Sequence, residues 1–119
     1  MRVFAGLATL VAAVALVGCG GDDSNKGSLT VYSGREEELV QPLIDQFEEK
    51  TGIQVDVRYG NSADLAATIA EEGDNSPADV FFSQDPGSLG AVADKLVELP
   101  QETLDRVAER FRDSGNRWT

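Results

Sequence analysis

The sequence predicts an α/β fold with a mostly parallel sheet built from βα units. Two features of the chain lead to this prediction. After residue 28, strand-like and helix-like hydrophobic patterns alternate three times, which is typical of a parallel sheet flanked by helices. Each strand-like pattern also ends in small polar residues that lead directly into a helix. Because crossovers between parallel strands are right-handed, we expect the three strand-to-helix corners, residues 33–35, 60–62 and 83–85, to share one edge of the sheet.

The first βα unit covers residues 29–50. Residues 29–33 form a short strand pattern. Residues 36–50 predict a helix, because their apolar residues fall on one stripe and three glutamates in the first turn suit the positive end of a helix dipole. Gly52 is the expected C-terminal cap. The stripe consists of Leu39, Val40, Leu43, Ile44 and Phe47.

The next two units follow the same rhythm. Alternating apolar residues predict a strand over 53–59, and a helix over 63–72 would begin at a cap from Asn61 or Ser62. Residues 78–83 predict a short buried strand. A third helix is expected after an N-cap at Asp85, and a last helix is expected over 101–112. The apolar face of the third helix would hold Leu89, Val92, Ala93 and Leu96.

Composition removes several classes of function. The chain has 119 residues, enough for one small domain, and its 10 basic against 21 acidic residues give a net charge of −11. This charge argues against nucleic-acid binding through phosphate neutralisation. The sequence has no histidine, the usual general base and the commonest transition-metal ligand. It has a single cysteine, so no intrachain disulfide is possible.

Residues 1–18 are predicted to be a lipoprotein signal peptide. One basic residue precedes an uncharged run from Val3 to Val17, which is shorter than the roughly 20 residues of a membrane span. The following Leu16-Val17-Gly18-Cys19 resembles a bacterial lipobox, which predicts cleavage before Cys19 and lipid on its sulfur. Residues 19–28 would then be the lipidated cysteine and a flexible tether. An ordinary signal peptide or helical anchor with a chance cysteine is the alternative.

This N-terminus predicts the location of the protein. We expect it to be exported and held by lipid on the outer face of the cell membrane, or in the periplasm.

The three corners are the candidate ligand site. In open α/β sheets, ligands bind beyond the carboxyl ends of the strands, and helix N-termini favour anions or polar oxygens. Arg35 has the geometry to clamp a planar anion through two parallel hydrogen bonds. The candidate ligand-binding residues are Ser33, Gly34, Arg35, Asn61, Ser62, Ser83 and Gln84, with Glu36 and Asp85 as candidate metal ligands.

Each of these residues also has a purely structural interpretation. Ser, Asn and Asp at such corners are ordinary helix caps, and Gly34 is an ordinary turn residue. Arg35 is the kind of surface residue that pairs with Glu37 or Glu38. The aromatic residues near the corners, Tyr59, Phe81 and Phe82, are expected in the core.

Two stretches carry a family resemblance. VYSGREEELVQPLIDQFEEKTGIQVDVRYG and DLAATIAEEGDNSPADVFFSQDPGSLGAV resemble the start of a bacterial extracellular solute-binding protein, nearest to the iron(III)-binding branch of the periplasmic binding proteins. The resemblance implies a two-lobed fold, of which residues 29–119 would be the N-terminal part of one lobe. It also implies a monomer that traps a small ligand and hands it to an ABC permease and its ATPase, without catalysis and without a resident cofactor.

The resemblance implies that the ligand is ferric iron with a bound synergistic anion such as carbonate. This chain differs from the ligand pattern of some family members at two positions. Where some members have an iron-binding histidine, this chain has Glu36, with Arg35 beside it to hold the anion. Where some have a glutamate ligand, it has Gln84, a poorer ligand for a hard cation, followed by Asp85. The paired tyrosines of the family lie later than Tyr32 and Tyr59, so we expect this chain to be the N-terminal portion of a longer protein.

Other functions remain open at this point. The same fold would suit an oxyanion, a polyamine or a sugar, and a small surface lipoprotein without a transport role is a further alternative. A surface-anchored hydrolase is the least supported, because the chain has no histidine to activate a nucleophile and its cysteine is expected to carry lipid.

Overall fold

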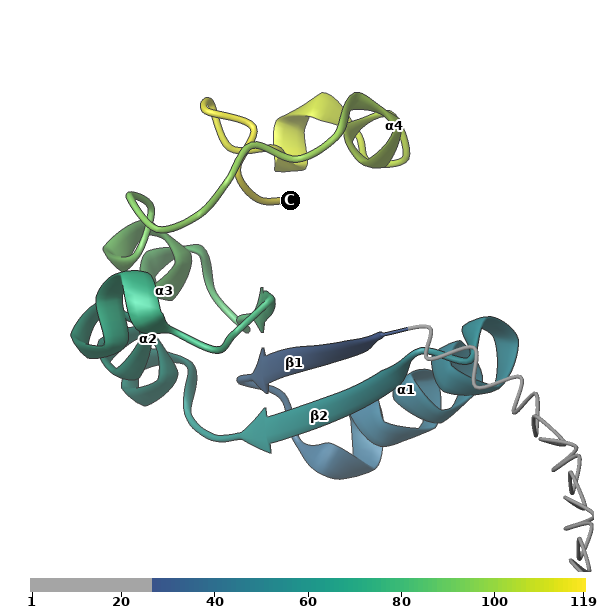
Figure 1. Ribbon diagram of the computed structural model, residues 1–119. Coiled ribbons are helices and arrows are strands. Elements are labelled where there is room, and N and C mark those ends of the chain that lie inside the picture. The colour runs from purple at the N-terminus through teal and green to yellow at the C-terminus, as the bar shows by residue number, and fades with distance from the viewer. Residues whose placement is uncertain (1–26) are drawn as a thin grey trace, which may run out of the picture.

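The computed structural model describes residues 27–119 and confirms the α/β fold (Figure 1). The predicted signal peptide, the lipidation site Cys19 and most of the tether lie outside the described residues. The sheet has three parallel strands in the order β2-β1-β3. These are β1 (Ser28–Ser33), β2 (Gln54–Tyr59) and β3 (Val80–Phe82). The first strand of the chain is therefore the central one, hydrogen-bonded on both sides.

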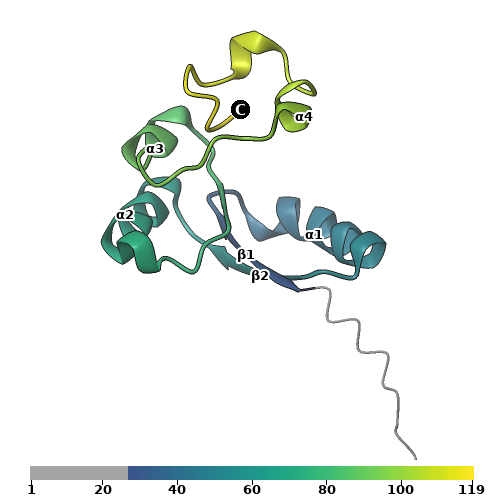
Figure 2. The ribbon, with the colours of Figure 1, turned by 45° about the horizontal axis from the view of Figure 1, so that its top comes forward.

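The helices lie on both faces of the sheet (Figure 2). On one face lies α1 (Glu37–Thr51), and on the other lie α2 (Ser62–Glu72) and α3 (Pro86–Ala91). The predicted caps are present: Asn61 Oδ1 accepts from Ala63 N at 2.8 Å, and Gly52 adopts a left-handed φ of 70°. No helix among residues 27–119 has the length and apolar character to cross a membrane.

The prediction of one continuous helix over residues 101–112 is wrong. The structure has a single-turn helix α4 (Gln101–Leu104) and a separate 3₁₀ turn, η2 (Glu109–Phe111). The Nε of Arg112 donates to Val107 O at 2.9 Å, which occupies the carbonyl that a continuing helix would offer to residue 111. The third helix also stops earlier than its apolar pattern predicts, at Ala91. A second 3₁₀ turn, η1 (Gly73–Asn75), precedes β3.

The core lies between the sheet and the α2–α3 face. Its buried residues come from β1, from α2 and from the position directly after α3, and they are Tyr32, Leu65, Ala66, Ile69 and Val92. Phe81 is half-buried and packs against this cluster, as predicted for a core residue. Val31 points to the opposite face of β1 because side chains alternate along a strand, and it is 7% exposed.

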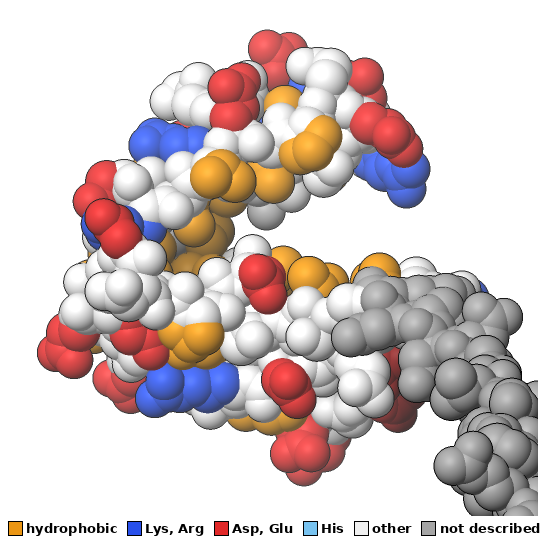
Figure 3. Space-filling model, in the orientation of Figure 1, with side chains coloured by type: hydrophobic (Ala, Val, Ile, Leu, Met, Phe, Trp, Pro, Cys, Tyr) orange, Lys and Arg blue, Asp and Glu red, His pale blue; other side chains and the backbone are white. Residues whose placement is uncertain are grey.

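Two predicted buried surfaces are exposed in the described part of the chain. In the α1 stripe, Val40 is buried, but Leu39 and Leu43 are 55% and 62% exposed. The strand predicted to be buried, β3, leaves Val80 and Phe82 45% and 44% exposed. The physical reason is that β3 is the edge strand, with a partner strand on one side among the described residues. Hydrophobic side chains accordingly line the hollow between the sheet and the C-terminal segment (Figure 3).

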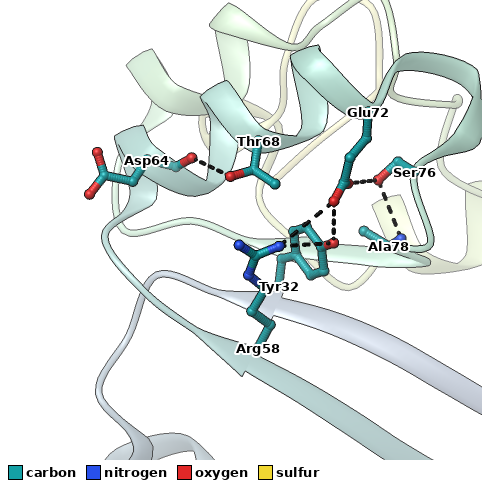
Figure 4. Close-up of polar contacts among 7 residues, drawn as sticks. All are labelled: Tyr32, Arg58, Asp64, Thr68, Glu72, Ser76 and Ala78. Atoms are coloured by element: carbon teal, nitrogen blue, oxygen red, sulfur yellow. Dashed lines mark hydrogen bonds and ion pairs between the residues drawn. The ribbon is translucent and has the colours of Figure 1, made fainter.

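A polar cluster around Tyr32 joins the layers (Figure 4). The Tyr32 hydroxyl donates to Glu72 Oε1 at 2.8 Å, and the Ser76 hydroxyl donates to Glu72 Oε2 at 2.7 Å. Arg58 Nη1 lies 3.7 Å from Glu72 Oε1, and its guanidinium lies 5.2 Å from the centre of the Tyr32 ring. The hydrogen bond from Ser76, followed by that from Tyr32 and the charge of Arg58, holds the pKa of Glu72 below its usual range.

Glu72→Gln is expected to lower the free energy of unfolding at neutral pH, because an amide cannot supply two charged acceptor oxygens. The contribution of the carboxylate is present above the ordinary glutamate pKa of about 4.3, and it is lost as the pH falls through the lower pKa of the folded state. Urea unfolding across this range should show the two proteins converging in acid. Glu71→Gln, the exposed neighbour on α2, is the control, and equal curves for Glu72→Gln and wild type would contradict the prediction.

Candidate functional site

The three strand-to-helix corners lie together at one edge of the sheet. Main-chain hydrogen bonds join them: Gly34 N donates to Phe82 O at 2.8 Å, and Gly60 N donates to Ser33 O at 3.1 Å. The third link uses a side chain, since Gln84 N donates to Ser62 Oγ at 3.0 Å. The predicted common edge is therefore present, and its corners are connected to one another.

The first corner depends on a close approach. Ser33 is fully buried, and its hydroxyl donates to Arg35 O and accepts from Arg35 N at 3.1 and 3.2 Å, which forms a local turn. Gly34 is also buried, and a Cβ at this position would overlap Ser62 Oγ and lie 3.2 Å from Ser62 Cα. The glycine is thus required by the contact between the end of β1 and the start of α2.

Several candidate residues serve as caps. Besides Asn61, Asp85 caps α3: its Oδ1 accepts from Ser88 N at 2.8 Å and its Oδ2 from the Ser88 hydroxyl at 2.9 Å. These two hydrogen bonds, the backbone one first, lower the pKa of Asp85. The Ser83 hydroxyl donates to Asp85 O and accepts from Asp85 N. For Asn61 and Asp85 the structure therefore contains the capping role that the sequence also allowed, while Ser83 forms a local turn with Asp85 just before α3.

Arg35 has a different partner from the one expected of a surface arginine. Its Nη1 donates to Gln84 Oε1 at 3.3 Å, and within residues 27–119 it forms no ion pair with Glu37 or Glu38. The other end of the Gln84 amide donates to Gly34 O. Arg35 is exposed and carries its charge at the corner, next to the neutral amide.

The carboxylates do not assemble into a metal centre in the described part of the chain. Glu36 is the residue before α1, with extended backbone and no capping hydrogen bond from its side chain. Among residues 27–119, no group of three Asp, Glu, His or Cys side chains lies close enough to hold a metal ion. Of the two candidate metal ligands, Asp85 already accepts hydrogen bonds from Ser88 on both carboxylate oxygens.

A hollow of about 400 Å³ lies beside the third corner. Ser83, Gln84 and Asp85 line it on one side, and Arg110 and Arg112 from the C-terminal segment line it on another. Sequence patterns do not place these two arginines near the corner, because they are distant in the chain and fall in the segment predicted as one long helix. Tyr59, predicted as a core residue, is only half-buried, and its hydroxyl donates to Gln41 Oε1 at 2.8 Å.

An open parallel sheet whose helix N-termini meet at one polar edge is the arrangement at which α/β proteins bind ligands. The chain belongs to the bacterial extracellular solute-binding proteins, because the model of that family matches residues 29–110. The match contains all three corners.

Individual relatives are similar over about the same region. The Fe(3+)-binding periplasmic protein of Serratia marcescens is 34% identical over 92 residues, which cover 76% of this chain and 27% of that protein. Among solved structures, iron-bound HitA from Pseudomonas aeruginosa aligns with a TM-score of 0.72 at 35% identity, covering 75% of this chain and 30% of that one. The Trichodesmium protein IdiA (FutA), in complex with iron and citrate ligands, aligns with a TM-score of 0.69 at 34% identity, covering 76% and 30%. The chain thus spans about a quarter of the length of the curated relative.

Gly34→Ala is expected to destabilise the fold by about 1–3 kcal/mol, because the added methyl group overlaps the Ser62 side chain and crowds its backbone. Adding Ser62→Ala should recover part of this loss, since it removes the nearest atom. Chemical unfolding of the single and double variants measures both effects. Gly90→Ala, where a Cβ meets nothing within 4 Å, is the matched control. A Gly34→Ala protein as stable as wild type would show that the corner tolerates a side chain.

Proposed function

We propose that this protein is the solute-binding component of a bacterial ABC importer, and that its cargo is ferric iron with a bound anion. The observation that carries the proposal is that the family match spans all three corners, while relatives aligned over the same region are named for ferric iron. The protein binds the ligand and delivers it to a membrane permease with its ATPase, and it catalyses no reaction. It acts as a monomer.

In this proposal, the sheet edge is one wall of the ligand cleft. Glu36 and Asp85 offer carboxylate oxygens, the donor type that suits a hard cation. Arg35 holds the synergistic anion, and the Trichodesmium relative solved with iron and citrate is consistent with an anion beside the metal. Ser33, Gly34, Asn61, Ser62, Ser83 and Gln84 form the polar surface of the wall, while the remaining ligands come from other parts of the whole protein.

The proposal includes a lipid anchor. The signal peptide directs export, Cys19 carries the lipid, and the Gly/Ser/Asp-rich residues up to Ser28 act as the tether. The lobe is then held near the outer face of the membrane, where a permease can receive the cargo.

A free oxyanion is the second candidate cargo. Its support is the exposed Arg35 at the edge, a cationic group that suits an oxyanion. Polyamines fit less well, because a cationic guanidinium would repel them.

The full-length protein is expected to bind ferric iron in an anion-dependent way. Titration with ferric nitrilotriacetate should require bicarbonate or citrate and should bring a visible charge-transfer band. Arg35→Ala should lower the apparent affinity for the anion roughly tenfold. This is the scale of one lost charge-assisted hydrogen-bond pair. Arg106→Ala, which removes a remote surface arginine paired with Glu102, is the control.

Two results would contradict this prediction in different ways. Phosphate or sulfate binding without any ferric binding would favour the oxyanion cargo. Ferric binding that is unchanged by Arg35→Ala would leave the cargo intact and remove the role of Arg35.

Cys19→Ser is expected to release the protein from the membrane, because a hydroxyl cannot accept the lipid that anchors it. Fractionation of cells and labelling with a radioactive fatty acid measure the change. Ser24→Ala in the same segment is the control. A Cys19→Ser protein that still sediments with membranes would mean that another element anchors it.

A further inference from the structure

Gln84 lies between two groups of opposite hydrogen-bonding character. Its Nε2 donates to Gly34 O, and its Oε1 accepts from Arg35 Nη1 at 3.3 Å. A carbonyl oxygen only accepts and a guanidinium only donates, so the two contacts fix the orientation of the amide. A glutamate at this position could not make both contacts, because a carboxylate has no proton to donate to Gly34 O.

The backbone beneath this amide is held in place. Gln84 N donates to the hydroxyl of Ser62, which is 6% exposed, and the carbonyl that receives the amide belongs to the buried Gly34. Within residues 27–119, the contact with Gln84 is the one hydrogen bond that the Arg35 side chain makes. An exposed arginine with one partner depends on that partner for its position.

We infer that Gln84 is a positioning residue that holds the guanidinium of Arg35 at the sheet edge for anion binding. The inference rests on the proposed function, since it takes Arg35 as the group that contacts the anion. A guanidinium that is already ordered loses less side-chain entropy when the anion arrives, so the anion binds more tightly. Gln84 thus acts through Arg35, and its amide has no need to contact the ferric ion.

A double-mutant cycle in the full-length protein tests the inference. The apparent affinity for bicarbonate is measured at a fixed concentration of ferric nitrilotriacetate. Gln84→Ala should weaken this affinity roughly threefold to tenfold in the wild-type background, and it should have no effect in the Arg35→Ala background. Equal losses in both backgrounds would mean that Gln84 contacts the ligand directly and would overturn the inference.

A second measurement needs no ligand. The ¹⁵N relaxation of Arg35 Nε reports the mobility of the guanidinium in the protein alone. Gln84→Ala should make this group more mobile, and unchanged relaxation would overturn the inference. Gln46→Ala is the matched control, because Gln46 Nε2 also donates to a backbone carbonyl, that of Pro42, at 3.1 Å, on α1. A wild-type protein without ferric binding would defeat the proposed function, while the relaxation data would still decide the role of Gln84.

Discussion

The contact between Gly34 and Ser62 determines how the sheet edge is built. Because Gly34 has no side chain, the end of β1 can lie directly against the first residue of α2. The Ser62 hydroxyl is then in position to accept from Gln84 N, which joins the third corner to the second. The Gln84 side chain also donates to Gly34 O, which joins the third corner to the first. One missing methyl group thus allows three corners from separate βα units to form a single surface.

Two successive residues of the central strand β1, Tyr32 and Ser33, make contacts in different parts of the structure. Tyr32 points into the core and reaches Glu72, whose second oxygen is held by Ser76 in the segment leading to β3. Ser33, one residue later, is buried at the corner and shapes the turn into Arg35. The layer contacts and the polar sheet edge therefore meet within two successive residues, Tyr32 and Ser33.

The sequence predicted the local elements and, from the handedness of crossovers, the shared sheet edge, but it missed features that depend on particular side-chain contacts and on the place of a strand in the sheet. The caps at Asn61 and Asp85 follow from short-range hydrogen bonds, and the strands follow from local hydrophobic patterns. The hydrogen bond from Arg112 to Val107 O, a carbonyl that a helix over 101–112 would use itself, cannot be anticipated from a helical periodicity. The exposure of β3 depends on its place at the edge of the sheet. The Gln84–Gly34 contact joins residues 50 positions apart, so the sequence could suggest both as site residues but not their pairing.

The charges at the edge constrain the cargo. The chain carries a net charge of −11, yet Arg35 lies at the first corner and Arg110 and Arg112 line the hollow beside the third. Two like unit charges 4 Å apart repel by about 4 kcal/mol at an effective dielectric constant near 20, and a trivalent cation would multiply that figure. A bare ferric ion would therefore avoid the guanidinium, whereas an anion between them turns the repulsion into two attractions. Under the proposed function, the arginine selects a metal that arrives with an anion. The neutral amide of Gln84 suits this task because, unlike a glutamate, it holds Arg35 without cancelling the charge that attracts the anion.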